Sequence, residues 1–330
     1  MDLEELTLHL SLKKSKFFIF LLSVFIIVIV LLGTSESFSH SRVTDKKEFY
    51  NVSKGSSFNA IIDDLTLNFV ENILLKIYLR LNDLHVAQAG YYYVKDKSWK
   101  ELFFSIANGE VFIFKLKIPS GKNLYEIKKI VSESHLLNDC HNFDCLDDQL
   151  RYIEGTLKPD TYFYKHSSSL AEVLKKSQDE FFQQASNLWA KRNPQLPINK
   201  LSDAIILASI VEKEAGNDIE KPTIAGVFLH RLSIGMKLQA DPTIIYGLYP
   251  NFNGDITKAD LKDKNNPYNT YHIPGLPPTP ISTISQSSLE AVILGMKNDY
   301  LYFVAKGDGE HKFSKTYKEH LAAVKRYQLN

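Results

Sequence analysis

The chain has 330 residues, with 39 lysines and arginines against 38 aspartates and glutamates. Nucleic-acid-binding surfaces are usually visibly basic, so this near-neutral balance gives no reason to expect a nucleic-acid partner. The length predicts more than one domain, and the hydrophobic content of 44% is ordinary for a globular protein.

An uncharged segment lies near the N-terminus. Phe17 to Gly33 reads FFIFLLSVFIIVIVLLG, and Thr34 and Ser35 extend the uncharged run. At about 1.5 Å per residue this segment can cross a hydrocarbon core of about 30 Å. A cleaved signal peptide is the alternative, but its apolar region usually has about 7 to 15 residues and ends in a small-residue cleavage site. We therefore predict an uncleaved transmembrane helix over residues 17–35.

The charges that flank this segment predict its orientation. Lys13, Lys14 and Lys16 precede it, and Glu36 follows it. Positively charged flanks stay in the cytoplasm. We therefore expect a cytoplasmic tail over residues 1–16, a single-pass anchor in the bacterial inner membrane, and a periplasmic or outer-face location for the rest of the chain.

Two cysteines, Cys140 and Cys145, stand in the segment DCHNFDC. Outside the cytoplasm a local disulfide is plausible for this pair, and free thiols are the main alternative. A metal site that includes His141 is a weaker hypothesis, since the spacing matches no common zinc pattern.

A small α+β module is predicted after a juxtamembrane linker over residues 36–47. Its predicted elements follow one another over residues 48–117: a strand at 49–52, a turn at Lys54-Gly55, a short helix opened by Ser56 or Ser57, a helix at 68–81, a strand at 89–94, a helix at 99–109 and a strand at 110–118. Ser98 and Glu101 have the spacing of a capping box before the last helix.

A larger mixed α+β domain is predicted over residues 118–330. Its predicted elements are a helix at 123–137, a turn-rich segment at 154–164 that ends as a strand, a long helix from Ser169 to Arg192, a helix at 202–215, an irregular polar segment at 239–283 and a hairpin at 300–314. The Asp308-Gly309 pair favours the tight turn of that hairpin.

The helix at 202–215 ends in an unusual acid. Residues three and four apart share a helix face, so Leu207, Ile210, Val211 and Glu214 form one stripe. Apolar surroundings and the negative end of the helix both disfavour the carboxylate, whereas Lys213 favours it. We therefore expect a raised pKa for Glu214, as a general acid needs.

Glu212 points about 200° away from Glu214, so the two are not a pair of carboxylates that face each other across a bond. We expect Glu212 to support the fold or the site, through Arg231 or a backbone donor. The alternative interpretation is that both acids form the solvated end of a helix.

The segment that follows is rich in side chains that can hydrogen-bond to sugars or stack on them. A polar, aromatic-lined cleft suits carbohydrate better than an apolar ligand, and a long irregular segment in a compact domain is usually functional. The candidate residues, which either bind substrate or support the site, are Gln239, Asp241, Thr243, Tyr246, Tyr268, Asn269, Thr270 and Tyr271.

Five motifs together resemble the MltG (YceG-like) family of membrane-anchored endolytic murein transglycosylases. The order and spacing of the five, from about Val52 to the C-terminus, make the resemblance specific. The motifs are EGTLKPDTY, ASIVEKEAG, GMKLQADPTIIYG, YNTYHIPGLPPTPIS and YLYFVAKGDGEHKFSKTYKEH.

The resemblance implies a LysM-like subdomain at 48–117, a catalytic domain at 118–330 and no cofactor or metal. The family's essential acid corresponds to Glu214. The implied reaction cleaves the β-1,4 bond between N-acetylmuramic acid and N-acetylglucosamine in nascent glycan strands, without water, and leaves a 1,6-anhydro end. Peptidoglycan strands are the implied substrate, and peptidoglycan synthases are the implied protein partners.

This sequence departs from the family pattern at three positions. His230 stands where Asn is common, Thr279 where Gly is common, and Lys158 near a position that is usually aromatic or aliphatic. None of these three differences affects Glu214.

Two other functions are consistent with the sequence. One is a non-catalytic, membrane-anchored scaffold that binds peptidoglycan. The other is a muramidase that uses water, which would need a second carboxylate near Glu214, and Asp241 is the best candidate.

Overall fold

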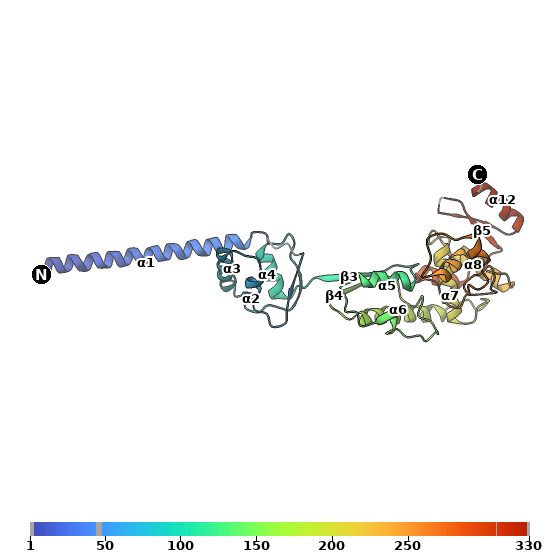
Figure 1. The fold of residues 1–330 in the computed structure, drawn as a ribbon, viewed down its shortest axis with the longest axis horizontal. Helices are drawn as coiled ribbons and strands as arrows, with labels where there is room; N and C mark the ends of the chain where they lie inside the picture. The colour runs from blue at the N-terminus through green and yellow to red at the C-terminus, as the bar shows by residue number, and fades with distance from the viewer. Residues whose placement is uncertain (1–2, 44–47, 308, 329–330) are drawn as a thin grey trace. The chain divides into compact units, whose positions relative to one another are not determined.

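The computed structural model describes residues 3–43, 48–307 and 309–328. The chain divides into two units, Met1–Ile113 and Phe114–Asn330 (Figure 1). Helix α1 (Leu3–Ser39) runs without a break through the predicted anchor, and Lys13–Ser39 is long and apolar enough to cross a membrane. Residues 36–39 of the expected linker therefore belong to α1, and residues 44–47 lie outside the described part of the chain.

The first unit is a small α+β module whose elements follow the predicted order. Strands β1 (Phe49–Val52) and β2 (Gly90–Tyr93) pair antiparallel. Helices α2 (Phe58–Asp64), α3 (Phe69–Leu81) and α4 (Trp99–Asn108) bury Tyr78, Tyr92, Trp99 and Phe103 between them and the strands. The predicted capping box is confirmed: Ser98 Oγ accepts from the Glu101 N–H, and Glu101 accepts from the Ser98 N–H.

The strand predicted at 110–118 belongs to a different sheet. Strand β3 (Ile113–Ile118) pairs with β4 (Asp160–Lys165) and not with β1 or β2. The boundary expected between residues 117 and 118 therefore falls inside a strand. Alternating apolar residues predict a strand, but they do not specify its partner.

The second unit is mainly helical. Its helices are α5 (Leu124–Ser132), a 3₁₀ turn η1 (His141–Phe143), α6 (Leu170–Trp189), α7 (Leu201–Glu214), α8 (Lys221–Ser233), α9 (Asp241–Leu248), α10 (Lys258–Lys262), α11 (Gln286–Leu294) and α12 (Tyr317–Tyr327). Helix α7 packs against α8, α9 and α11, and every residue from Ala204 to Val211 is buried. The end of α7 is therefore held by the core of the unit.

Two predictions about helices in this unit are wrong. Helix α5 ends at Ser132, several residues before the predicted end. The segment 239–283, predicted to be irregular, contains α9 and α10. Pro242 lies in the first turn of α9, where a missing N–H costs no hydrogen bond, so the Asp-Pro pair is compatible with the start of a helix.

The predicted C-terminal hairpin is confirmed. Strands β5 (Tyr302–Ala305) and β6 (His311–Ser314) pair antiparallel, with Tyr302 opposite Ser314 and Ala305 opposite His311. Asp308 of the predicted turn lies outside the described residues. Elsewhere in the unit, Cys140 and Cys145 form a disulfide with an S–S distance of 1.98 Å.

Candidate active site

The end of α7 places Glu214 next to the C-terminal hairpin. Leu207, Ile210 and Val211 are fully buried, which confirms the predicted apolar stripe, and Glu214 at its end is half-buried. Gly216 comes two residues after Glu214, and a Cβ atom at this position would lie 2.6 Å from the carbonyl oxygen of Gly309. The glycine that follows the helix thus lets the hairpin pack close to the acid.

Glu214 opens into a cleft of about 500 Å³. Arg231 of α8 and three residues of the predicted polar segment, Gln239, Asp241 and Tyr271, line it. The rest of the lining comes from β5, β6, α12 and the end of the chain: Tyr302, Phe303, Val304, Ala305, His311, Tyr317, His320, Val324 and Gln328. The acid therefore faces a polar and aromatic groove, to which the predicted segment contributes three residues and the C-terminal segment most of the others.

The surroundings of Glu214 favour its protonated form. Its carboxyl group makes no hydrogen bond or ion pair with any residue that the structure describes. Burial and the nearby charge of Asp241 raise the pKa of Glu214 to about 8, and the charge of Arg231 opposes this only in part. Lys213 has a different partner, since its Nζ donates to the Gly121 carbonyl over 3.1 Å. The predicted rise in the pKa of Glu214 is confirmed. Burial is its main cause, and the charge of Asp241 is a second cause that the sequence analysis did not predict.

Asp241 and Arg231 are both hydrogen-bonded to nearby residues. The Tyr271 hydroxyl donates to Asp241 Oδ1 over 2.7 Å. Arg231 is buried, and its guanidinium donates to the carbonyls of Leu301 and Leu238. Arg231 thus ties α8 to the residue before β5, and its positive charge remains at the cleft.

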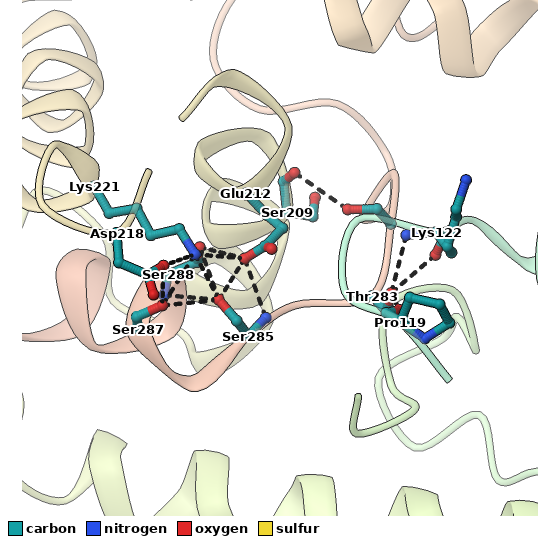
Figure 2. Close-up of polar contacts among 11 residues, drawn as sticks. Pro119, Lys122, Ser209, Glu212, Asp218, Lys221, Thr283, Ser285, Ser287 and Ser288 are labelled. Atoms are coloured by element: carbon teal, nitrogen blue, oxygen red, sulfur yellow. Dashed lines mark hydrogen bonds and ion pairs between the residues drawn. The ribbon is translucent and has the colours of Figure 1, made fainter. Parts of the chain in front are cut away.

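Glu212, unlike Glu214, is surrounded by hydrogen-bond donors (Figure 2). Its Oε2 accepts from Lys221 Nζ and from the Ser285 N–H at 3.2 Å, and from the hydroxyls of Ser285 and Ser288 at 2.5 Å. Burial acts to raise the pKa of Glu212, but these donors outweigh it and hold the pKa below its ordinary value. The expected backbone donor is present, whereas the expected pairing with Arg231 is wrong.

Three of the candidate residues support the site by holding the loop together. Thr243 is buried, and its hydroxyl donates to the Ala240 carbonyl over 2.6 Å and lies 2.9 Å from Thr270 Oγ1. The Asn269 side chain is also buried and donates to three backbone carbonyls, those of Asp260, Leu261 and Asp263. These residues shape the segment that carries Gln239, Asp241 and Tyr271.

Tyr246 and Tyr268 surround a second buried acid, which the sequence analysis did not single out. The Tyr246 hydroxyl donates to Glu154 Oε2 over 2.9 Å, and the Leu124 N–H donates to the same oxygen over 3.1 Å. Burial raises the pKa of Glu154 to about 7. The Tyr268 hydroxyl lies 2.8 Å from Thr279 Oγ1. Neither tyrosine is among the residues that line the cleft.

The sequence analysis also missed the part that the C-terminal segment plays in the cleft. His311 lines the cleft, and both its backbone nitrogen and its ring Nδ1 lie 2.8 Å from carboxylate oxygens of Glu220. Tyr302 and His320 stack with ring centroids 5.2 Å apart. The motif GEHKFSKTYKEH contains these histidines, but only the fold brings them next to Glu214.

Comparisons with known proteins agree with this geometry. The YceG-like family matches residues 50–326. A Bacillus subtilis protein named endolytic murein transglycosylase is 30% identical over 307 residues, which cover 84% of each chain. A Streptococcus pneumoniae protein of the same name is 27% identical over 71% of this chain, and the match spans 49% of that relative.

A solved structure has a related fold. The crystal structure of a YceG-like protein from Listeria monocytogenes superposes with a TM-score of 0.57 and 26% sequence identity, over 84% of this chain and 99% of that one. The family match extends over most of the chain, from residue 50 in the first unit to residue 326 in the second. The chain therefore belongs to the YceG-like family, a family of lytic transglycosylases.

Proposed function

We propose that this protein is an endolytic murein transglycosylase. It cleaves the bond between N-acetylmuramic acid and N-acetylglucosamine inside nascent peptidoglycan strands and leaves 1,6-anhydro ends, which limits strand elongation. The similarity to relatives named endolytic murein transglycosylase supports the substrate and the internal cut.

One observation carries the chemical part of this proposal: the pKa of Glu214 is raised to about 8 beside a cleft of about 500 Å³. A carboxyl group with this pKa is mostly protonated at neutral pH and can still give up its proton, which is what a general acid must do.

Glu214 can serve both halves of the reaction. It first donates its proton to the glycosidic oxygen that leaves with N-acetylglucosamine. The resulting carboxylate then accepts the proton of the muramyl 6-hydroxyl as that oxygen bonds to C1. The bond to the leaving oxygen is broken, the bond from O6 to C1 is formed, and Glu214 ends the cycle protonated. The reaction needs neither water nor a second base.

Asp241 has a supporting role in this scheme. Its negative charge raises the pKa of Glu214 and can stabilise positive charge that develops at C1 in the transition state. A muramidase is the alternative, because Asp241 lines the same cleft and could activate a water molecule. Gln239, Tyr271 and His311 are proposed to contact the glycan from the walls of the cleft.

We also propose the cellular arrangement. Helix α1 anchors the chain in the bacterial inner membrane, with the N-terminus in the cytoplasm and the residues after α1 outside, because the lysines precede the span. The first unit is proposed to be a LysM-like glycan-binding subdomain, and peptidoglycan synthases are the expected protein partners.

Product analysis tests the proposal. The full-length chain in detergent micelles is incubated with uncrosslinked glycan strands, and the fragments are analysed by mass spectrometry. We expect fragments cut at internal bonds that end in 1,6-anhydro-muramic acid, one water lighter than a reducing end. Reducing ends would support the muramidase, and intact strands would support the non-catalytic scaffold.

A further inference from the structure

The C-terminal hairpin leaves one edge of each of its strands without a neighbouring strand. Among the residues that the structure describes, β5 pairs only with β6. An edge strand presents backbone N–H and C=O groups that no neighbouring strand satisfies, and such groups can bind another chain or a ligand. The two outer edges of this hairpin have different surroundings.

The register of the hairpin shows which groups of β5 point to its outer edge. Opposed residues of an antiparallel pair alternate between hydrogen-bonded pairs and pairs that form no ladder hydrogen bond. The Lys306 N–H donates to the Glu310 carbonyl over 2.8 Å, so these residues form a hydrogen-bonded pair. The next pair, Ala305 and His311, therefore forms no ladder bond, and the N–H and C=O of Ala305 point away from β6. Phe303, two residues earlier, has the same orientation.

The outer edge of β6 supports this assignment. The backbone N–H of His311 points away from β5 and donates to Glu220 Oε1 over 2.8 Å. That outward group is thus satisfied within the protein. For Phe303 and Ala305 the described residues supply no backbone hydrogen bond outside the β5–β6 ladder. Their outward N–H and C=O groups are therefore available to a ligand.

The outer edge of β5 borders the cleft of Glu214. All four residues of β5, from Tyr302 to Ala305, line this cleft. Successive side chains of a strand point to opposite faces, so a cavity that borders four consecutive residues lies along an edge of the strand. Strand β6 occupies the other edge of β5, and Ala305 is exposed. The outward backbone groups of β5 therefore face the space in which the proposed reaction takes place.

We infer that the outer edge of β5 binds the acetamido groups of the glycan. The inference rests on the proposed function, in which both sugars of the substrate carry an N-acetyl group. An acetamido group is a secondary amide with one N–H and one C=O, and these complement the C=O and N–H that a strand edge presents. Phe303 and Ala305 lie roughly 7 Å apart along the strand, so the edge offers two such places.

The start of this edge is held in position by bonds within the protein. Arg231 Nε donates to the Leu301 carbonyl over 2.7 Å, and the Leu301 N–H donates to the Ser314 carbonyl over 3.0 Å. Groups that are already ordered lose little entropy when a ligand binds. A sugar without its acetyl group would leave the backbone groups of the edge unpaired, and a site of this kind discriminates against such a substrate.

Kinetics with modified glycan test the inference. The full-length chain in detergent micelles is given uncrosslinked strands, the same strands after chemical de-N-acetylation, and a portion of these restored with acetic anhydride. We expect kcat/KM to fall about tenfold on the de-N-acetylated strands and to recover on the restored ones. Equal values on all three would overturn the inference and leave the proposed function standing, whereas no cleavage of any strand would overturn both.

A proline at position 305 tests the edge itself. Ala305→Pro removes an outward N–H but no ladder hydrogen bond, which is the situation in which edge strands tolerate proline. Ala305→Val is the matched control, because valine has a similar bulk and keeps the N–H. We expect Ala305→Pro to reduce the preference for N-acetylated strands several-fold, and Ala305→Val to keep this preference whatever its rate.

An unchanged preference in Ala305→Pro would overturn the inference, because an effect of the free amines alone would remain in this variant. Circular dichroism reports whether the variant is folded. If it is not, the wild-type comparison of the three kinds of strand decides.

Discussion

Glu212 and Glu214 lie two residues apart at the end of the same helix, yet their carboxyl groups are tuned in opposite directions. Glu212 is surrounded by two serine hydroxyls, a backbone N–H and Lys221, and its pKa is lowered. Glu214 has no such donors among the described residues and lies near the negative charge of Asp241, and its pKa is raised to about 8.

Burial alone therefore does not decide the protonation state of an acid. Desolvation acts to raise the pKa of both groups, and the donors around each carboxylate decide whether that effect is overcome. Glu212 is thus suited to hold the end of α7 in place, and Glu214 to transfer a proton. Five experiments can test this comparison, beginning with the largest expected effect.

Glu214→Gln should abolish most of the activity. The amide keeps the size of the side chain but has no acidic proton to donate, so we expect the rate of glycan cleavage to fall by about 10² to 10⁴. The release of soluble fragments from uncrosslinked glycan measures this rate. The matched control is Lys213→Gln, which removes one charge from the exposed neighbour and should keep nearly full activity. If Glu214→Gln were as active as wild type, the acid would have to be another group.

Glu212→Ala should affect stability much more than Glu214→Gln does. It removes the acceptor shared by Lys221 and the hydroxyls of Ser285 and Ser288, although Lys221 keeps its ion pair with the exposed Asp218 over 2.6 Å. A buried polar group that loses its acceptor typically costs about 1–3 kcal/mol in the free energy of unfolding. Urea denaturation followed by circular dichroism measures this loss. The control is Glu290→Ala on α11, a partly exposed acid bonded to Gln286, where we expect a change within about 0.5 kcal/mol.

The lowered pKa of Glu212 predicts that the stability of the fold depends on pH. The folded-state pKa of Glu212 is below its ordinary value of 4.5. The contribution of the Glu212 carboxylate to the free energy of unfolding is therefore fully present above pH 4.5, and it decreases as the pH falls through the lowered pKa. The stability difference between wild type and Glu212→Ala should therefore shrink in acid. A difference that grew in acid would contradict the assignment.

Asp241→Asn should move the pH profile of the enzyme. Glu214 must be protonated to act as an acid, so activity should fall as the pH rises through its pKa of about 8. Removing the negative charge of Asp241 lowers that pKa, and we expect the alkaline limb to shift toward neutral pH by up to about one unit. Initial rates between pH 5 and 10 measure the shift. A complete loss of activity at every pH would instead favour the muramidase, in which Asp241 acts on water.

His311→Ala should give the smallest effect. The imidazole lines the cleft and is held by Glu220, with no assigned role in proton transfer. We expect KM for glycan to rise a few-fold with kcat nearly unchanged, as for a contact made equally in the ground state and the transition state. Steady-state kinetics separate the two parameters. A drop in kcat alone would place His311 in the chemical step.

The local features of the fold could be predicted from the sequence. The apolar stripe of α7, the capping box at Ser98 and the C-terminal hairpin each depend on residues within a few positions of one another. Their periodicity and capping chemistry are local, so they remain readable without any knowledge of the rest of the chain.

The features that sequence reasoning missed depend on distant pairings. The apolar alternation of β3 indicated a strand, but its partner β4 comes 42 residues later, from Ile118 to Asp160. The partners of Glu212 come from α8 and α11, and most of the residues that line the cleft come from 302–328. Nothing in the local pattern of these segments specifies which other segment they meet.

The position of the C-terminal segment has a consequence for biosynthesis. Residues 302–328 supply one wall of the cleft, although Glu214 lies much earlier in the chain. The ribosome releases the N-terminal part first, so the acid emerges well before the groove around it can form. The groove around the acid is therefore incomplete until β5, β6 and α12 have folded, so under the proposed function a newly made molecule cannot cut glycan before translation has passed this segment.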